Sequence, residues 1–427
     1  MSTLTNMSRP PGDSSEMLPA GEQKRRLPGW ARGALWAVVA IAALSTTSYL
    51  TDMNVLTSTN TVQTALRLAL PILLAALGGL WAERSGVINI GLEGMMVLGT
   101  FGAALGAFYG GVWAGLAAAI GFGALGGLLH ALATVTFNVN HIVSGVAINL
   151  LGLGVTKYLA TLIFQPLSGN PRQSPPVPKF DTYSATGLSD WLGALEDEQR
   201  VGLSDVAGIV RGLITEISPL AIIALLLIPV SYLILWRTRF GLRLRSCGEN
   251  PVAAESLGVN VYLHKYVALA ISGGLAGMGG ASLVLLPGGA DYLENQTNGR
   301  GYIGLAAMIF GNWRPGGLLG GAALFGYADG LQLAGGGEAV LALFYGASML
   351  LAVLVVLKLV KRDWLPALLS AVGAGVLYYI YWANDELPDD LIPYTPHFVT
   401  LIVLAVAAQR LRPPKAIGKR YRRGEDD

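Results

Sequence analysis

Long apolar runs separated by short polar stretches dominate the pattern of this chain. Within 87–112, for example, Glu93 is the only charged residue. About 20 consecutive apolar residues suffice to cross a bilayer core as a helix, so the pattern predicts an all-α polytopic membrane protein. Twelve apolar segments are predicted, at 33–50, 62–81, 87–109, 112–135, 142–164, 219–236, 265–287, 302–312, 315–333, 339–357, 364–382 and 397–411.

The eighth segment, 302–312, is too short to cross the bilayer as a regular helix. It is predicted to be a half-helix or a re-entrant element. The pattern IGLxxM occurs at 90–95 and again at 303–308, and in the predicted topology the two copies enter the membrane from opposite sides. An inverted repeat, which is common in transporters, would produce this relation.

Composition agrees with a membrane protein and excludes a soluble one. Charged residues make up 13% of the chain and hydrophobic residues 53%, with a mean hydropathy of +0.52. Soluble globular proteins carry about 25% charged residues. The single cysteine, Cys247, excludes an internal disulfide and a cysteine-based metal cluster, and it favours a reducing compartment.

The distribution of basic residues predicts the orientation. If the N-terminus is inside, most of the 29 lysines and arginines fall in cytoplasmic stretches, whereas an outer loop at 385–390 is acidic. Both termini are therefore predicted to be cytoplasmic. Residues 1–32 are predicted to be a disordered cytoplasmic tail, 33–411 the transmembrane domain and 412–427 a basic cytoplasmic tail.

Two long polar stretches interrupt the predicted spans. The first, 165–218, falls outside, is Pro-rich at its start and becomes amphipathic over 188–217. The second, 237–264, is cytoplasmic and predicts one short helix, with Asn250 as N-cap, Pro251 at the first helical position and Gly258 at the C-cap. A bare connection needs no such helix, so we interpret it as a docking helix for a partner, with a plain surface helix as the alternative.

The polar residues within the spans are candidates for a substrate path. An acid in a membrane segment is costly, so Glu93 has either a functional role or a structural one near a helix start, stabilised by the helix dipole or by Arg84. We weight these two interpretations equally. Asn89, Asn149 and the pair Asn140 and His141 are able to bond a hydroxyl-rich solute, although interhelical hydrogen bonds are favoured for each one alone.

Glycine is abundant inside the predicted membrane domain, with 56 residues in the chain. Small residues let helix backbones approach closely, and tight packing is the preferred interpretation for most of these glycines. The alternative is that flexible, discontinuous helices surround a translocation path.

Motifs for catalysis are absent from the sequence. No GxxxxGK[ST] phosphate loop, no HExxH, no GxSxG and no Cys/His cluster occurs, and the four histidines are scattered. The chain is therefore predicted not to be an enzyme, to hydrolyse no nucleotide by a phosphate loop, and to bind no metal or other cofactor itself.

Four stretches resemble the inner-membrane permeases of ABC importers, in particular the branch for nucleosides and simple sugars, which is related to the branched-chain amino-acid permeases. They are 83–96, 141–150, 248–251 and 299–311, in order within most of 60–335. The resemblance implies an inverted-repeat permease core of about ten segments. An additional pair of spans, 339–382, departs from the family pattern, and the outer loop at 165–218 is longer than usual.

The resemblance also implies partners. A cytoplasmic ABC ATPase would hydrolyse the ATP, a second homologous permease would form a heterodimer with this chain, and an extracellular binding lipoprotein would deliver the solute; no nucleic acid is expected. Substrate would cross between the two permeases near Asn89 and Glu93. The coupling helix would seat in the ATPase through residues of the cytoplasmic loop, namely Gly248, Glu249, Asn250, Pro251, Ala253, Ala254 and Gly258.

Two other functions are compatible with the apolar pattern. A secondary transporter or channel working alone would use Glu93 as an ion or proton site. A membrane-embedded enzyme is disfavoured by the missing catalytic motifs. Within the ABC hypothesis the motifs favour nucleosides over sugars, but no residue distinguishes a nucleoside from a sugar or an amino acid.

Overall fold

The computed structural model describes residues 29–198, 200, 202–360, 362–388, 391, 394–395, 411–422 and 424. Over these residues the only regular elements are helices, together with two isolated bridges that join Gln173 to Leu293 and Tyr183 to Ile217. The all-helical fold class is confirmed. The predicted disordered tail lies almost entirely outside the described residues.

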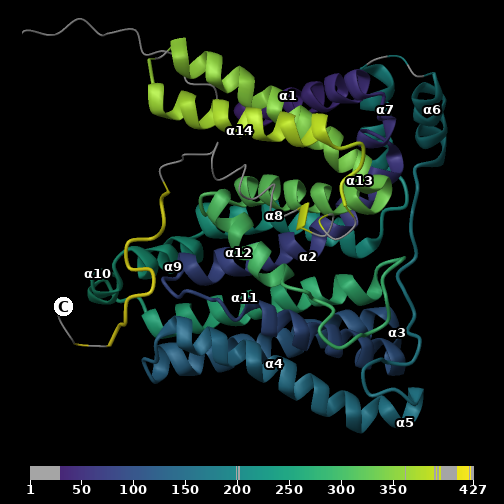
Figure 1. Cartoon of the computed structure of the whole chain (residues 1–427). Helices are drawn as coiled ribbons and strands as arrows, with labels where there is room; N and C mark the ends of the chain where they lie inside the picture. The colour runs from purple at the N-terminus through teal and green to yellow at the C-terminus, as the bar shows by residue number, and fades with distance from the viewer. Residues whose placement is uncertain are drawn as a thin grey trace, which may run out of the picture.

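The helices form a bundle whose long members lie side by side (Figure 1). In chain order they are α1 (Gly29–Thr51), η1 (Asn54–Leu56), α2 (Thr59–Arg84), α3 (Leu92–Ala131), η2 (Leu132–Thr136), α4 (His141–Ile163), α5 (Gln165–Ser168), α6 (Thr186–Asp197), α7 (Leu203–Ile214), α8 (Pro219–Arg237), α9 (Arg239–Glu249), α10 (Pro251–Ser256), α11 (Val261–Leu285), α12 (Arg300–Phe310), α13 (Pro315–Val360) and α14 (Trp364–Ala383).

Seven of the described helices are long and apolar enough to cross a membrane. They are α2, α3, α4, α8, α11, α13 and α14. Two of them bend sharply, α3 at Gly111 (φ 80°, ψ 177°) and α13 at Gly336 (φ 61°, ψ −155°), which are conformations that glycine adopts readily. Each bend separates two of the predicted segments. The count of twelve stays a prediction, because α1 is not among the seven and segment 397–411 lies outside the described residues except for Leu411.

The short eighth segment is present as α12, which has 11 residues. A helix of that length rises only about 16 Å, roughly half of a bilayer core. The prediction of an element too short to cross is therefore confirmed.

The closest packing in the bundle joins α3 to α11. A Cβ atom on Gly123 would lie 2.2 Å from the carbonyl oxygen of Gly273, and a Cβ atom on Gly273 would lie equally close to the carbonyl oxygen of Gly123. These two positions exclude any side chain. The interpretation of intramembrane glycines as packing residues is confirmed at this crossing.

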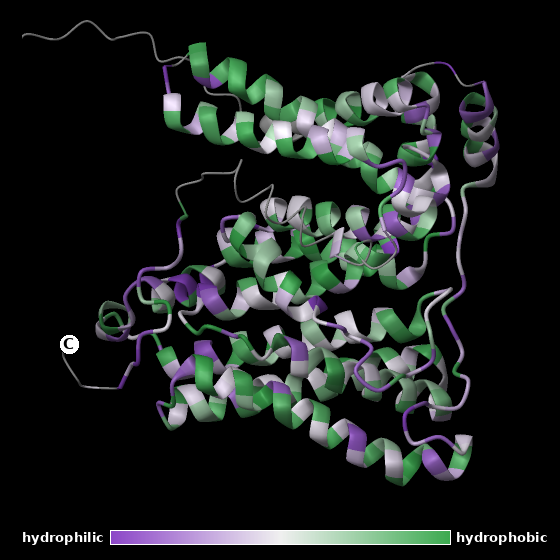
Figure 2. Ribbon diagram, in the orientation of Figure 1, coloured by the Kyte–Doolittle hydropathy of each residue, from purple (hydrophilic) through white to green (hydrophobic). Residues whose placement is uncertain are grey.

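The polar elements gather at the two ends of the bundle. Helices α9 and α10 and the described C-terminal residues lie at one end, and α5, α6 and α7 lie at the other (Figure 1). Figure 2 shows the long helices rich in hydrophobic residues and hydrophilic residues concentrated near the ends. We call these the α10 end and the α6 end. Loops 165–218 and 237–264 thus occupy opposite ends, as their predicted placement on opposite sides of a membrane requires.

The amphipathic part of loop 165–218 forms a helical hairpin, α6 and α7, that is fastened to the start of α2. The Glu196 carboxylate accepts hydrogen bonds from the Thr59 amide (3.0 Å), from the Thr59 hydroxyl (2.6 Å) and from Arg211 Nη1 (3.1 Å). Burial raises the pKa of this carboxyl, but the bonds from Thr59 and Arg211 outweigh burial and leave the pKa below its ordinary value.

Candidate translocation and coupling sites

The chain between α2 and α3 is not helical. Gly86 takes a positive φ of 91° after the end of α2, and regular helix resumes only at Leu92. Irregular backbone at membrane depth is tolerated only where protein groups satisfy it. Two histidines serve this role at Ile88, because His141 Nδ1 accepts from its amide (3.3 Å) and His130 Nε2 lies 3.0 Å from its carbonyl oxygen.

Asn89 and Asn149 hold the rest of this unwound segment. Asn89, fully buried, accepts from the Gly91 amide (3.1 Å) and donates to the Ser272 hydroxyl on α11 (2.9 Å). Asn149 on α4 accepts from the Gly94 amide (2.7 Å) and donates to the Ile90 carbonyl oxygen (3.1 Å). Both amides therefore make hydrogen bonds between segments, the interpretation that the sequence favoured for each alone.

Glu93 lies at the point where the starts of α3 and α12 meet. Its side chain is 7% exposed and accepts hydrogen bonds from the Thr297 hydroxyl (2.6 Å), the Gly299 amide (2.8 Å) and the Gly301 amide (2.7 Å). A carboxylate is favoured at the positive end of a helix dipole. The structural interpretation of Glu93 is supported. The helix that Glu93 caps is not its own helix α3 but α12, which is distant from Glu93 in the sequence.

Arg84 does not take the position proposed for it beside Glu93. Its guanidinium donates to the carbonyl oxygen of Trp313, from Nε at 3.2 Å and from Nη2 at 2.5 Å. It also lies over the Trp236 ring, 5.2 Å from the ring centre. Arg84 therefore ties the end of α2 to the loop after α12.

Asn140 lies apart from the other predicted path residues. It is exposed and caps the start of α4, where its side-chain oxygen accepts from the amides of Ile142 (2.9 Å) and Val143 (3.3 Å). His141 follows directly and is 4% exposed. Asn89, Glu93, His141 and Asn149 thus converge on the unwound segment, whereas Asn140 performs a local capping role.

Three polar residues at the start of α12 were missed as site candidates. Tyr302 is 47% exposed, and its hydroxyl accepts from Asn149 Nδ2 at 2.8 Å. Gln296 Nε2 and Arg300 Nε are buried and have no hydrogen-bond partner among the described residues. Buried donors are usually paired, so a polar solute at this place would accept hydrogen bonds from Gln296 and Arg300. The signal in the sequence was the polar run that precedes a span too short to cross.

The loop at the α10 end contains two helices, so the prediction of one was incomplete. Thr238 caps the first, α9, by accepting from the Gly241 amide (3.1 Å). The chain turns extended at Asn250, as expected for a residue before proline. Asn250 then accepts from the Ala253 amide (3.0 Å), which confirms it as the N-cap of α10. The C-cap of α10 is Leu257, so the prediction of Gly258 at that position was wrong by one residue; Gly258 follows it with a φ of 80°.

The predicted coupling residues differ in accessibility. Ala253 is exposed, but Ala254 is 3% exposed and packs against Cys247. Gly248 is also buried, and a Cβ atom there would lie 2.3 Å from the Arg84 carbonyl oxygen. The most prominent side chain of the loop is one that the sequence analysis missed, Leu257, which is 85% exposed at the end of α10.

Cys247, the single cysteine, is buried and belongs to the same apolar cluster as Ala254 of α10. Burial raises the pKa of its thiol to about 11, and the positive charge of Lys265 opposes part of that rise. Among the described residues, no group of three or more His, Cys, Asp or Glu side chains is arranged to hold a metal ion.

Comparison with known proteins gives a family match over residues 61–357, to the permease component of branched-chain amino acid transport systems. The chain is 39% identical over 277 residues to the guanosine ABC transporter permease protein NupQ of Bacillus subtilis, covering 62% of this chain and 80% of that one. It is 30% identical over 358 residues to the nucleoside ABC transporter permease protein NupC of Lactococcus lactis, covering 82% and 93%.

A second Bacillus subtilis protein also matches. The guanosine ABC transporter permease protein NupP is 25% identical over 260 residues, which cover 56% of this chain and 64% of that one. No solved structure matches the chain.

Proposed function

Since the chain belongs to the permease family of branched-chain amino acid transport systems, we propose that it is the membrane-spanning subunit of an ATP-driven importer for nucleosides. The relatives named for guanosine and nucleoside transport support this substrate class. ATP would be hydrolysed by a separate ATPase chain. Sugars are the runner-up substrate class.

The observation that carries the proposal is the projection of Leu257 at the end of α10. Leu257 is 85% exposed at the end of α10, and in this proposal a protein partner buries its apolar side chain. In this proposal the ATPase receives Leu257 and Ala253, while Gly248, Asn250, Pro251 and Gly258 shape the loop.

The proposed solute path runs past the start of α12. Gln296, Arg300 and Tyr302 would bond the solute, because two of them have unpartnered donors and the third is half exposed. The unwound segment would hold these three residues in place through the hydrogen bonds of Asn89, Glu93, His141 and Asn149. Asn140 would contribute from the start of α4, which it caps.

The proposed assembly contains a second permease and a binding lipoprotein. Two guanosine permeases in one organism, both similar to this chain, support a heterodimer. The α10 end would be cytoplasmic together with both termini, and the α6 end would face the lipoprotein. The proposed core has about ten segments in an inverted repeat, with 339–382 as an added pair of spans.

The test is uptake into vesicles by the assembly purified from its native membrane through a tag on this chain. We expect an ATPase chain to co-purify and guanosine uptake to require ATP, with competition from other nucleosides but not from pentoses or branched-chain amino acids. Leu257→Asp should abolish ATPase recovery, whereas Asn384→Asp, which adds a charge beyond α14, should not. Uptake by this chain alone along a proton gradient would overturn the proposal in favour of a secondary transporter.

A further inference from the structure

Residues 411–422 run across the loop at the α10 end as an ordered strap. The Ala416 amide donates to the Gly248 carbonyl oxygen (2.9 Å), and the Gly418 amide donates to the Gly86 carbonyl oxygen (3.0 Å). The Lys415 amide donates to the Glu249 carboxylate (3.3 Å). The strap therefore bonds both to the end of α9 and to the start of the unwound segment.

One side of the strap is built into the fold. Ala416 is 6% exposed and Tyr421 is 7% exposed, and Tyr421 packs with Cys247 and Ala254 in one apolar cluster. The Tyr421 hydroxyl donates to the Glu255 carboxylate on α10. Displacing the strap would uncover this cluster, so the strap is a fixed part of the surface around α10.

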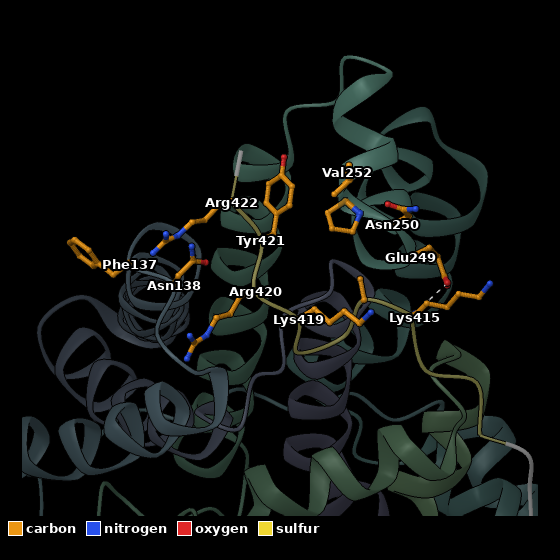
Figure 3. Close-up of a pocket in the computed structure, with 12 residues that line it drawn as sticks. Phe137, Asn138, Glu249, Asn250, Val252, Lys415, Lys419, Arg420, Tyr421 and Arg422 are labelled. Atoms are coloured by element: carbon orange, nitrogen blue, oxygen red, sulfur yellow. Dashed lines mark hydrogen bonds between the residues drawn. The ribbon is translucent and has the colours of Figure 1, made fainter. Parts of the chain in front are cut away.

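The other side of the strap is basic. Lys415, Lys419, Arg420 and Arg422 are exposed. Together with Glu249, they line a cavity of about 700 Å³, which is also lined by Asn250 and by the first residues of α10, Pro251 and Val252 (Figure 3). Clustered positive charge around a hollow attracts an acidic surface and accelerates its encounter.

We propose that the strap is a second limb of the ATPase docking surface, and that its basic side chains hold acidic side chains of the ATPase beside α10. This inference rests on the proposed function. The ATPase is the proposed partner because the basic surface continues into the surface around Leu257: the helix that lines one side of the cavity carries Leu257 at its other end. A partner that covers Leu257 lies within reach of the strap.

The experiment measures the affinity of the full-length permease for the co-purified ATPase chain at several salt concentrations. Lys419→Glu with Arg420→Glu should weaken binding at least tenfold at low salt and flatten the salt dependence, since exposed charges are screened by salt. Lys419→Arg with Arg420→Lys should bind as wild type. The matched control is Lys358→Glu with Arg362→Glu, which reverses two basic residues near the turn between α13 and α14 and should have no effect.

Protection of Cys247 from a thiol reagent verifies that the strap remains seated in each variant, because Cys247 is buried in the same apolar cluster as Tyr421. Unchanged affinity and salt dependence in the strap variant would overturn the inference, as would an equal loss in the control. Loss of binding to anionic lipid vesicles with ATPase affinity intact would assign the basic surface to lipid instead. Failure of the wild-type permease to bind any ATPase would overturn the proposed function as well. Loss of ATPase binding in Leu257→Asp, with no loss in the strap variant, would overturn only the inference about the strap.

Discussion

The Glu93 carboxylate accepts a hydrogen bond from the Gly301 amide at 2.7 Å, across 208 residues of sequence. These two residues belong to the first turns of α3 and α12. Glu93 lies within the first copy of the IGLxxM pattern, at 90–95, and Gly301 lies just before the second copy, at 303–308. The two copies therefore mark two helix starts that meet inside the bundle. This is the arrangement by which discontinuous helices in transporters present their N-terminal ends to one place.

Replacing Glu93 should destabilise the contact between α3 and α12. Glu93→Ala leaves the amides of Gly299 and Gly301 without their acceptor, and each buried unsatisfied group costs about 1–3 kcal/mol. We expect the free energy of unfolding to fall by about 2–6 kcal/mol, measured by thermal or denaturant unfolding in detergent. Glu294→Ala, which removes ion pairs to the largely exposed Lys157 and Arg172, is the control and should change little. Equal stability of the two variants would contradict this role.

Gly273 should tolerate no side chain. Gly273→Ala places a methyl group against the Gly123 carbonyl oxygen and forces α3 and α11 apart, which typically costs about 1–3 kcal/mol. Gly121→Ala on α3 is the matched control, because a Cβ atom there meets no atom within 4 Å. Melting temperatures of the two variants decide the matter, and a drop for both would mean that the substitutions act through something other than this crossing.

Gln296 should affect uptake through its free amide. Gln296→Leu retains the volume and removes the donor, so we expect KM for the nucleoside to rise about tenfold, the equivalent of one hydrogen bond of about 1.4 kcal/mol. Gln332→Leu is the control, since Gln332 on α13 also has a buried unpartnered amide atom but lies away from the start of α12 in the sequence. A similar KM change in both variants would argue against solute binding at Gln296.

Cys247 should react slowly with thiol reagents. With the pKa raised from 9.0 to about 11, the thiolate fraction at pH 8 is about a hundredfold smaller than for a free cysteine, in addition to steric protection. Maleimide labelling should therefore be slow at pH 8 and accelerate as the pH approaches 11. Ala253→Cys in a Cys247→Ala background supplies an exposed thiol that should label rapidly. Equal rates would show that the thiol is accessible.

Acid should loosen the α6–α7 hairpin from α2. Because the folded-state pKa of Glu196 lies below its ordinary value of 4.5, the stabilisation is complete above that value and is lost as the pH falls through the folded-state pKa. Hydrogen exchange over 186–214 should therefore rise as the pH is lowered below about 4.5, relative to the intrinsic rate. Glu196→Gln should remove most of this pH dependence, and its persistence would assign the effect to other carboxylates.

Local patterns predicted local structure well. The Asn250 cap, Pro251 at the first position of α10 and the short α12 each depend on neighbouring residues or on segment length, and the structure has all three. The partners of Glu93 were beyond such reasoning, because they come from 204 to 208 residues away. Without them, a buried acid is equally consistent with an ion site and with a helix cap.

The strap was missed for a different physical reason. Its basic composition is typical of a solvated tail, and nothing local indicates that Ala416 and Tyr421 are buried. Their burial depends on a groove formed by Gly86, Gly248 and α10, which exists only after the bundle has assembled. Leu257 was missed for the converse reason, since periodicity favours burying a leucine.

The strap also sets an order of events during synthesis. Every described membrane helix precedes residues 411–422 in the chain, so the ribosome makes the strap after all of them. The surface around α10 is incomplete until the Ala416 and Gly418 amides have bonded to Gly248 and Gly86. A chain whose synthesis stops before residue 411 would therefore insert its described helices and yet display an incomplete surface around α10.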